Sequence, residues 1–398
     1  MKRTLGTADA VVVGLGAMLG AGIFVVLAPA AAAAGSGLLL GLAIAAFVAY
    51  CNATSSARLA ALYPQSGGTY VYGRERLGPF WGYTAGASFI VGKTASCAAM
   101  ALTVGYYVWP GHAHEVAVAV VLALTAVNVA GVQKSALLTR VIVVAVLAVL
   151  CTVIVAILGS GDVDAGRLAL GDDASAFGIL QAAGLLFFAF AGYARIATLG
   201  EEVRDPARTI PRAIALALAI ALVVYAVVAV VVLAQLGGTT LSSATAPLAD
   251  AVAAAGLPGL VPVVRVGAAI AALGALLALI LGVSRTVLAM SRDRHLPSSL
   301  AVVHDRFDSP YRAEIAVGVV VAGLAAVADV RTAIGFSSFA VLVYYAIANA
   351  AAFTLGRKLI PVLGTIGCVV LAVTLPATSV LAGVAVLVLS AAVYGLRR

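Results

Sequence analysis

Long apolar stretches recur along the whole sequence, and they limit what the chain can fold into. Many run for roughly 18 to 25 residues, the length that an α-helix needs to cross a bilayer. They are too long and too continuous to be strands of a membrane barrel. The composition agrees, because 63% of the residues are hydrophobic and only 10% are charged, with a mean hydropathy of +1.14. These features predict an all-α integral membrane protein.

Glycine, proline and charged residues divide the apolar stretches into about twelve expected transmembrane helices. They lie near residues 8–34, 37–62, 79–108, 115–131, 138–159, 174–199, 211–234, 262–290, 313–328, 332–355, 359–375 and 377–396. We expect three groups along the chain, which are five spans within 1–159, five within 160–355 and two within 356–398. A stretch too short to cross, near 246–257, is expected to form an external helix.

The positive charges are concentrated in every second connection between these spans. Lysine and arginine gather in alternate connections, such as 204–212 and 292–312, whereas 162–173 carries mainly aspartate. Since cytoplasmic connections collect positive charge, this pattern predicts a multi-pass protein of the cell membrane with both termini in the cytoplasm. It also accounts for the net charge of +8 without a nucleic-acid partner, which would need a basic patch on a water-exposed domain.

Residue types that usually signal catalysis or metal binding are scattered. The four cysteines lie in apolar runs without paired spacing, and we interpret them as small packing residues. The four histidines fall in connections, and there is neither a Walker motif nor an HExxH motif. We therefore expect no enzyme activity, no metal and no bound cofactor. A channel fits less well, because channels need repeated filters that symmetry usually assembles.

Two spans contain signals of an interrupted helix. The first holds four glycines within residues 14–24, each of which weakens a helix by about 1 kcal/mol relative to alanine. Close packing through Gly16 and Gly20 is one reading, and an unwound segment that exposes backbone groups to a ligand is the other. In the sixth span, Gly192 follows the aromatic cluster 187–190. Each interruption falls in the first helix of a five-helix group, which favours a binding site at mid-membrane.

At these residues the sequence resembles a known family. The stretches 16–24, 64–72, 187–214 and 284–297 are similar, in order, to the amino acid, polyamine and organocation (APC) transporter superfamily, in its branch of cationic amino acid transporters. The resemblance implies a LeuT-type five-plus-five inverted repeat with two additional C-terminal helices. It also implies a substrate site in which Phe190 is an aromatic lid and Ala189 and Ala191 shape the side-chain pocket. The implied substrate-binding residues are Gly20, Ala21, Gly22, Ile23, Phe188, Ala189, Phe190, Ala191 and Gly192.

Lys93 lies deep in the third span, where an unpaired ammonium is costly. Many relatives in this superfamily place a lysine in the fifth span, but our alignment puts Val146 there. We hypothesise that Lys93 supplies the missing charge and couples transport to protons, with Ser284 near the same site.

Two further arginines lie toward the cytoplasmic ends of their spans. We expect Arg195 and Arg285 to pair with Glu201, Glu202 or Asp293 and to form an inner gate.

The sequence therefore predicts a secondary transporter that moves amino acids by alternating access. A sensor of the same fold that binds without transport, and a transporter of polyamines or other amines, remain alternatives. A positive Lys93 beside the pocket favours neutral amino acids as the small-molecule substrate. The sequence leaves open whether protons, sodium or exchange drives transport, and it leaves open the oligomeric state in the lipid bilayer.

Overall fold

The computed structural model describes residues 5–64, 67–131, 136–171, 174–200, 202–304, 307 and 309–396. Within these ranges the chain folds into α-helices joined by short 3-10 turns. The helices of the first half are α1 (Thr7–Met18), α2 (Ala21–Val25), α3 (Leu27–Ala34), α4 (Leu38–Leu62), α5 (Thr69–Leu77), α6 (Pro79–Val108), α7 (Ala113–Val129) and α8 (Ala136–Ser160).

The second half is also helical. Its helices are α9 (Ala176–Phe190), α10 (Ala194–Ala197), α11 (Pro206–Ser243), α12 (Pro247–Ala254), α13 (Val261–Arg292), α14 (Tyr311–Val327), α15 (Val330–Phe353), α16 (Leu359–Thr374) and α17 (Ala377–Leu396). Two 3-10 turns matter below, which are η4 (Ala191–Tyr193) and η6 (Ser298–Leu300).

Ten helical segments in the described part of the chain are long and apolar enough to cross a membrane. Two further expected spans correspond to α14 and α16, with 17 and 16 residues. At 1.5 Å per residue these two helices reach only about 24 to 26 Å, so they need local thinning of the bilayer to span it. The chain is thus a multi-pass helical membrane protein, as its apolar pattern predicted.

Some helix boundaries differ from the expected ones. The seventh span was expected to begin at residue 211, but α11 begins at Pro206 and holds Pro211 within its second turn. The first proline is well suited to a helix start because its missing N–H has no partner there anyway. Toward its other end α11 is kinked at Gly237, whose φ of 70° suits glycine. The short helix expected within 246–257 is α12.

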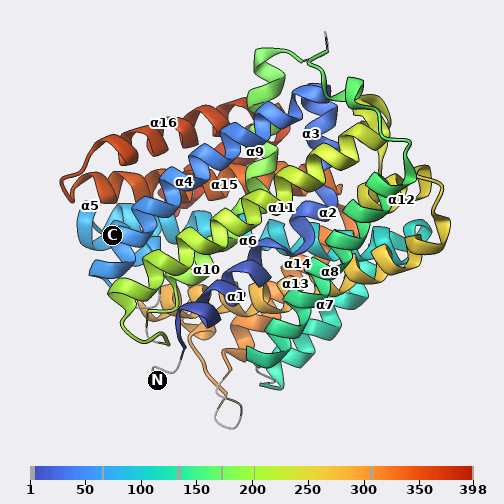
Figure 1. The fold of residues 1–398 in the computed structure, drawn as a ribbon. Coiled ribbons are helices and arrows are strands. Elements are labelled where there is room, and N and C mark those ends of the chain that lie inside the picture. Colours follow the sequence, from blue (N-terminus) through green and yellow to red (C-terminus); the bar gives the residue numbers. More distant parts are fainter. Residues whose placement is uncertain are drawn as a thin grey trace.

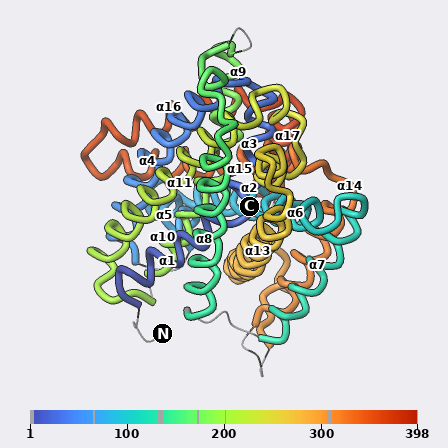
Figure 2. The backbone as a smooth tube through the Cα atoms, turned by 45° about the vertical axis from the view of Figure 1, so that its right-hand side comes forward, coloured from blue at the N-terminus to red at the C-terminus, as the bar shows by residue number. Residues whose placement is uncertain are grey.

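The long helices of the first half pack against long helices of the second half. α6 lies against both α13 and α15, α8 lies against α13, and α7 lies against α14. The interrupted helices pack similarly, because α4 contacts α9 and α11 contacts both α1 and α3. Figure 1 shows α1 and α11 side by side, with α16 at the edge of the bundle. The N-terminus and the connection from α8 to α9 lie at opposite ends of the bundle in Figure 2.

Three of the four cysteines, Cys51, Cys97 and Cys368, are buried, as expected of packing residues. Cys151 is exposed, so the packing interpretation is wrong for this residue. It lies on α8, a helix that is largely exposed on the outside of the bundle. A small apolar side chain there suits contact with lipid equally well.

Candidate functional site

The first expected span is interrupted near its middle. α1 ends at Met18, and Leu19 and Gly20 leave the helix before α2 begins at Ala21. A Cβ added to Gly20 would lie 2.5 Å from the Cβ of Ala275 on α13, which is too close for two carbon atoms. The close-packing interpretation of this glycine is therefore confirmed, and the helix is also broken there, while the exposure of backbone groups to a ligand stays a prediction.

The sixth expected span is also interrupted. α9 ends at Phe190, the tighter turn η4 follows, and α10 begins at Ala194. A change from α to 3-10 winding shifts the acceptor of each N–H, so carbonyl oxygens near the junction become available to other donors. In this chain the released oxygens face the core of the bundle.

The two interruptions touch each other through backbone atoms. A Cβ on Gly22 would lie 2.9 Å from the Cα of Ala189, and a Cβ on Gly192 would lie 2.4 Å from the carbonyl oxygen of Ala17. Only glycine permits such an approach, because any side chain would force the backbones apart. Segments that are about 170 residues apart in the sequence thus form one crossing of two interrupted helices.

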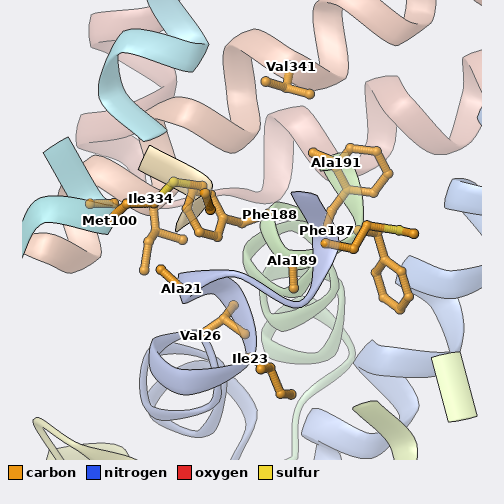
Figure 3. Packing of buried hydrophobic residues seen from close by; sticks show 14 of the residues in the cluster. Ala21, Ile23, Val26, Met100, Phe187, Phe188, Ala189, Ala191, Ile334 and Val341 are labelled. Carbon is orange, nitrogen blue, oxygen red and sulfur yellow. The ribbon is translucent and has the colours of Figure 1, made fainter. Parts of the chain in front are cut away.

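All nine residues that the resemblance assigned to substrate lie at or next to this crossing. Eight are buried, and Gly192 is partly exposed. Figure 3 shows Ala21 and Ile23 from the first interruption and Phe188 and Ala189 from the second within one cluster of buried hydrophobic residues. The expected lid, Phe190, is fully buried and packs edge-on against Tyr225, with ring centroids 5.1 Å apart. In this conformation the crossing is shielded from solvent.

Tyrosines that the sequence analysis missed hold the released carbonyl oxygens. The Tyr225 hydroxyl on α11 is 2.5 Å from the carbonyl oxygen of Met18 and 3.1 Å from that of Ala189, so it bridges the two interruptions. The Tyr107 hydroxyl on α6 donates to the carbonyl of Phe24 at 2.7 Å. A tyrosine inside an apolar span needs a partner for its hydroxyl, and this need was the available signal.

Lys93 reaches the interruption of the sixth span. Its Nζ donates to the carbonyl oxygen of Ala191 at 3.3 Å, and the Tyr345 hydroxyl on α15 donates to the same oxygen at 3.3 Å. Ser284, which we expected near Lys93, donates instead to the carbonyl of Ile280 on its own helix. Among the described hydrogen bonds none joins Lys93 to Ser284, and the expectation that the two lie near the same site stays a prediction.

The charged residues expected to form a gate lie around α10. Arg195 donates to Thr198 at 3.1 Å and lies within electrostatic range of both Glu202 and Arg285. Glu201 lies outside the described residues. Arg195 therefore has one arginine and one acidic residue as electrostatic neighbours, and a further negative charge nearby would offset the repulsion between the two arginines.

Asp293, an expected partner of these arginines, contacts α5 instead. Its carboxylate is 3.1 Å from Nη1 of Arg74 and accepts a hydrogen bond from Tyr70. The Tyr70 hydroxyl also lies 3.1 Å from Nδ1 of His295. Burial and the neighbouring carboxylate raise the pKa of Tyr70, so it remains a neutral donor. These contacts fasten α5 to the end of α13.

The start of α1 is tied to the segment after α10. Leu5 donates its N–H to the carbonyl of Glu202 at 3.1 Å, and Arg204 donates its N–H to the carbonyl of Leu5 at 2.9 Å. Asp9 also forms an ion pair with Arg140 on α8. Sequence analysis could not predict these contacts, because no local pattern pairs residues so far apart.

Comparison with known proteins gives a consistent result. The family described as Amino acid permease matches residues 9–395. An uncharacterized transporter of Mycobacterium tuberculosis is 71% identical over 404 residues, covering 100% of this chain and 92% of the relative. The chloroplastic cationic amino acid transporter 7 of Arabidopsis thaliana is 30% identical over 383 residues, covering 89% of this chain and 65% of the relative. The branched-chain amino acid permease BcaP of Bacillus subtilis is 24% identical over 335 residues, covering 78% and 72%.

Proposed function

Because this chain belongs to the amino acid permease family, as the resemblance predicted, we propose that it is a secondary active transporter that moves amino acids across the cell membrane by alternating access. The observation that carries the proposal is the crossing of two interrupted helices, at Gly22 with Ala189 and at Gly192 with Ala17. Interrupted helices at membrane depth are tolerated where they line a ligand site. The relatives that are named as transporters or permeases support transport over catalysis.

The packing supports two five-helix repeats, within 1–159 and 160–355, followed by a pair of helices within 356–398. The first span corresponds to the sixth, the second to the seventh, and so on to the fifth and tenth. When corresponding spans are exchanged, each contact given below becomes another observed contact. The contact of α4 with α9 maps onto that of α11 with α1, and α6 with α15 maps onto α13 with α8. A LeuT-type inverted repeat produces such a set of helix contacts, which stays the same when the two halves are exchanged.

The substrate would bind through its backbone groups at the crossing. The first N–H groups of α2, from Ala21 to Ile23, have no partners within the helix and suit a carboxylate. The carbonyl oxygen of Ala191 suits an ammonium, and in this conformation Lys93 donates to it. A substrate ammonium that bound this oxygen would compete with Lys93 for it, which would link substrate binding to the arrangement of α6.

The pocket favours a neutral side chain. Ala189 and Ala191 present only methyl groups, Phe188 adds an apolar ring, and Lys93 places a positive charge beside them. A cationic side chain would meet like charge there at a cost that a neutral one avoids. Of the relatives, BcaP is named for branched-chain amino acids and the Arabidopsis protein for cationic ones, and the position of Lys93 favours the former class.

The charged cluster of Arg195, Glu202 and Arg285 would close the cytoplasmic side, with the Leu5 backbone contacts and the Asp9 ion pair beside it. With this side in the cytoplasm, the start of α1 would lie there too, as the positive charges in alternate connections predict.

Uptake into proteoliposomes tests the proposal. The purified protein would be reconstituted and given a panel of radiolabelled amino acids and polyamines, with and without imposed proton and sodium gradients and with and without internal amino acid. Saturable uptake of neutral amino acids is expected. Binding without uptake would establish the sensor instead, and uptake confined to polyamines would establish the amine transporter. Protein-free liposomes serve as the control for leakage.

A further inference from the structure

Glu314 is a buried acid that the transport scheme above leaves without a role. It lies in the first turn of α14, and its side chain is 0% exposed. Neither Oε1 nor Oε2 has a hydrogen-bond partner among the described residues. An ionised carboxylate in such surroundings is strongly destabilised, whereas the neutral acid is tolerated much better. The position is therefore built to favour a bound proton.

Among the described groups, one is an electrostatic partner of Glu314. α14 packs against α6, α7, α13 and η6. From α13, Arg285 lies within electrostatic range of the Glu314 carboxyl. Lys93 of α6 bonds to Ala191, and His114 of α7 lies against the carbonyl of Ala325 near the far end of α14. Of the other arginines, Arg265 of α13 donates to the carbonyl of Tyr107, Arg312 of α14 donates to Tyr311 and to the carbonyl of Ser299, and Arg292 of α13 is exposed. α6 also carries Tyr83, which packs on His295, and η6 consists of Ser298, Ser299 and Leu300.

Arg285 also connects Glu314 to the interrupted sixth span. The Arg285 guanidinium acts on Arg195 of α10, and Glu202 acts on Arg195 from the other side. Arg285 thus has Glu314 and Arg195 as electrostatic neighbours, and Arg195 has Arg285 and Glu202, so an acid stands at each end of this set of interactions. The two arginines repel each other, and the repulsion is offset only while both terminal acids are ionised.

We propose that Glu314 is the proton-binding group of this transporter, and that Arg285 transmits its charge state to Arg195 on the half-helix α10. With the proton on Glu314, Arg285 loses its counter-charge, and the repulsion between the arginines drives α10 away from α13. When the proton is released, the carboxylate attracts Arg285 toward α14, and α10 returns toward α13. This inference rests on the proposed transport function, because it names the ion that drives it.

The test compares Glu314→Gln with Glu115→Gln in proteoliposomes supplied with a radiolabelled mixture of the common amino acids. Glutamine keeps the volume of the side chain and cannot bind or release a proton. Glu115 lies on α7 with an exposed carboxyl, so its variant is the matched control. We expect an inward proton gradient to drive accumulation by the wild-type and Glu115→Gln proteins. The Glu314→Gln variant should lose this accumulation completely while counterflow shows that it is folded.

A second measurement needs no variant. Dicyclohexylcarbodiimide reacts with protonated carboxyls in apolar surroundings, so mass spectrometry of the wild-type protein should find the adduct on Glu314, formed faster at acidic than at alkaline pH. Labelling that is absent from Glu314 or independent of pH would overturn the proposal even if Glu314→Gln fails to fold.

The transport outcomes separate this inference from the proposed function. Gradient-driven accumulation that survives in Glu314→Gln would overturn the role of Glu314 and leave transport standing. If the same accumulation is lost in Lys93→Met, the proton-binding role would pass to Lys93. Wild-type uptake that ignores the proton gradient would do the same. If the wild-type protein shows no uptake at all, the proposed function fails, and the pH dependence of carbodiimide labelling still decides whether Glu314 binds a proton.

Discussion

Replacing Gly192 with alanine should disable the crossing of the two interrupted helices. The added methyl carbon would lie 2.4 Å from the carbonyl oxygen of Ala17 and 2.7 Å from the backbone nitrogen of Met18. A carbon and a carbonyl oxygen approach to about 3.3 Å at closest, so the backbones must separate by about 0.9 Å. Both atoms belong to main chain, so no side chain can turn aside to make room.

Overpacking of this kind costs about 1 to 3 kcal/mol. Because about 1.4 kcal/mol corresponds to a factor of ten, apparent affinity for substrate should fall by about 5- to 150-fold. The assay is concentration-dependent uptake into proteoliposomes, with thermal unfolding in detergent run in parallel. The control is Gly282→Ala on α13, where an added Cβ meets no atom within 4 Å. Equal affinities for the two variants would refute the argument that the crossing binds substrate.

Three further substitutions test other contacts. Tyr225→Phe leaves two buried carbonyl oxygens without their donor and should lower the free energy of unfolding by about 1 to 3 kcal/mol, and an unchanged melting temperature in detergent would contradict this. Lys93→Met removes the positive charge beside the pocket, so arginine should begin to compete with labelled leucine for uptake, and a variant that excludes arginine as well as the wild type does would count against the charge as the selective feature. Asp9→Asn removes the ion pair with Arg140 and should speed hydrogen exchange of the Arg204 amide, and equal exchange rates would show that the backbone contacts hold without it.

The sequence predicted the scaffold well for reasons that are local. Long apolar runs require helices in a bilayer, and clustered glycine weakens a helix wherever it occurs. Those two facts located the interruption near Gly20, and the single glycine after the aromatic cluster 187–190 located the one near Gly192, before any contact was known. The start of α11 was misplaced because a proline at residue 211 looked like a boundary, whereas the helix begins at Pro206 and carries both prolines in its first turns.

The contacts that complete the site are not local. Tyr225 meets Met18 and Ala189 only because α11 folds across both interruptions. Glu314 stands near the start of an expected span, where a carboxyl ordinarily reaches the membrane surface, and its burial comes from α6, α7 and α13 packing around it. No spacing within α14 encodes that enclosure, so sequence reasoning passed over the residue. Lys93 was singled out correctly as buried, but its partner could not be chosen from several helices.

The backbone contacts between Leu5 and Arg204 have a mechanical consequence. They join the start of α1 to the segment that follows α10. The half-helices α1 and α10 are therefore expected to move as one unit, with hinges near Gly20 and Gly192. Neither half-helix can swing outward alone without breaking both hydrogen bonds. Because main-chain atoms make the joint, substitution at Leu5 or Val203 changes its packing and leaves its geometry in place. The concerted motion of the two half-helices is therefore encoded in the backbone, and it tolerates sequence change at the joint itself.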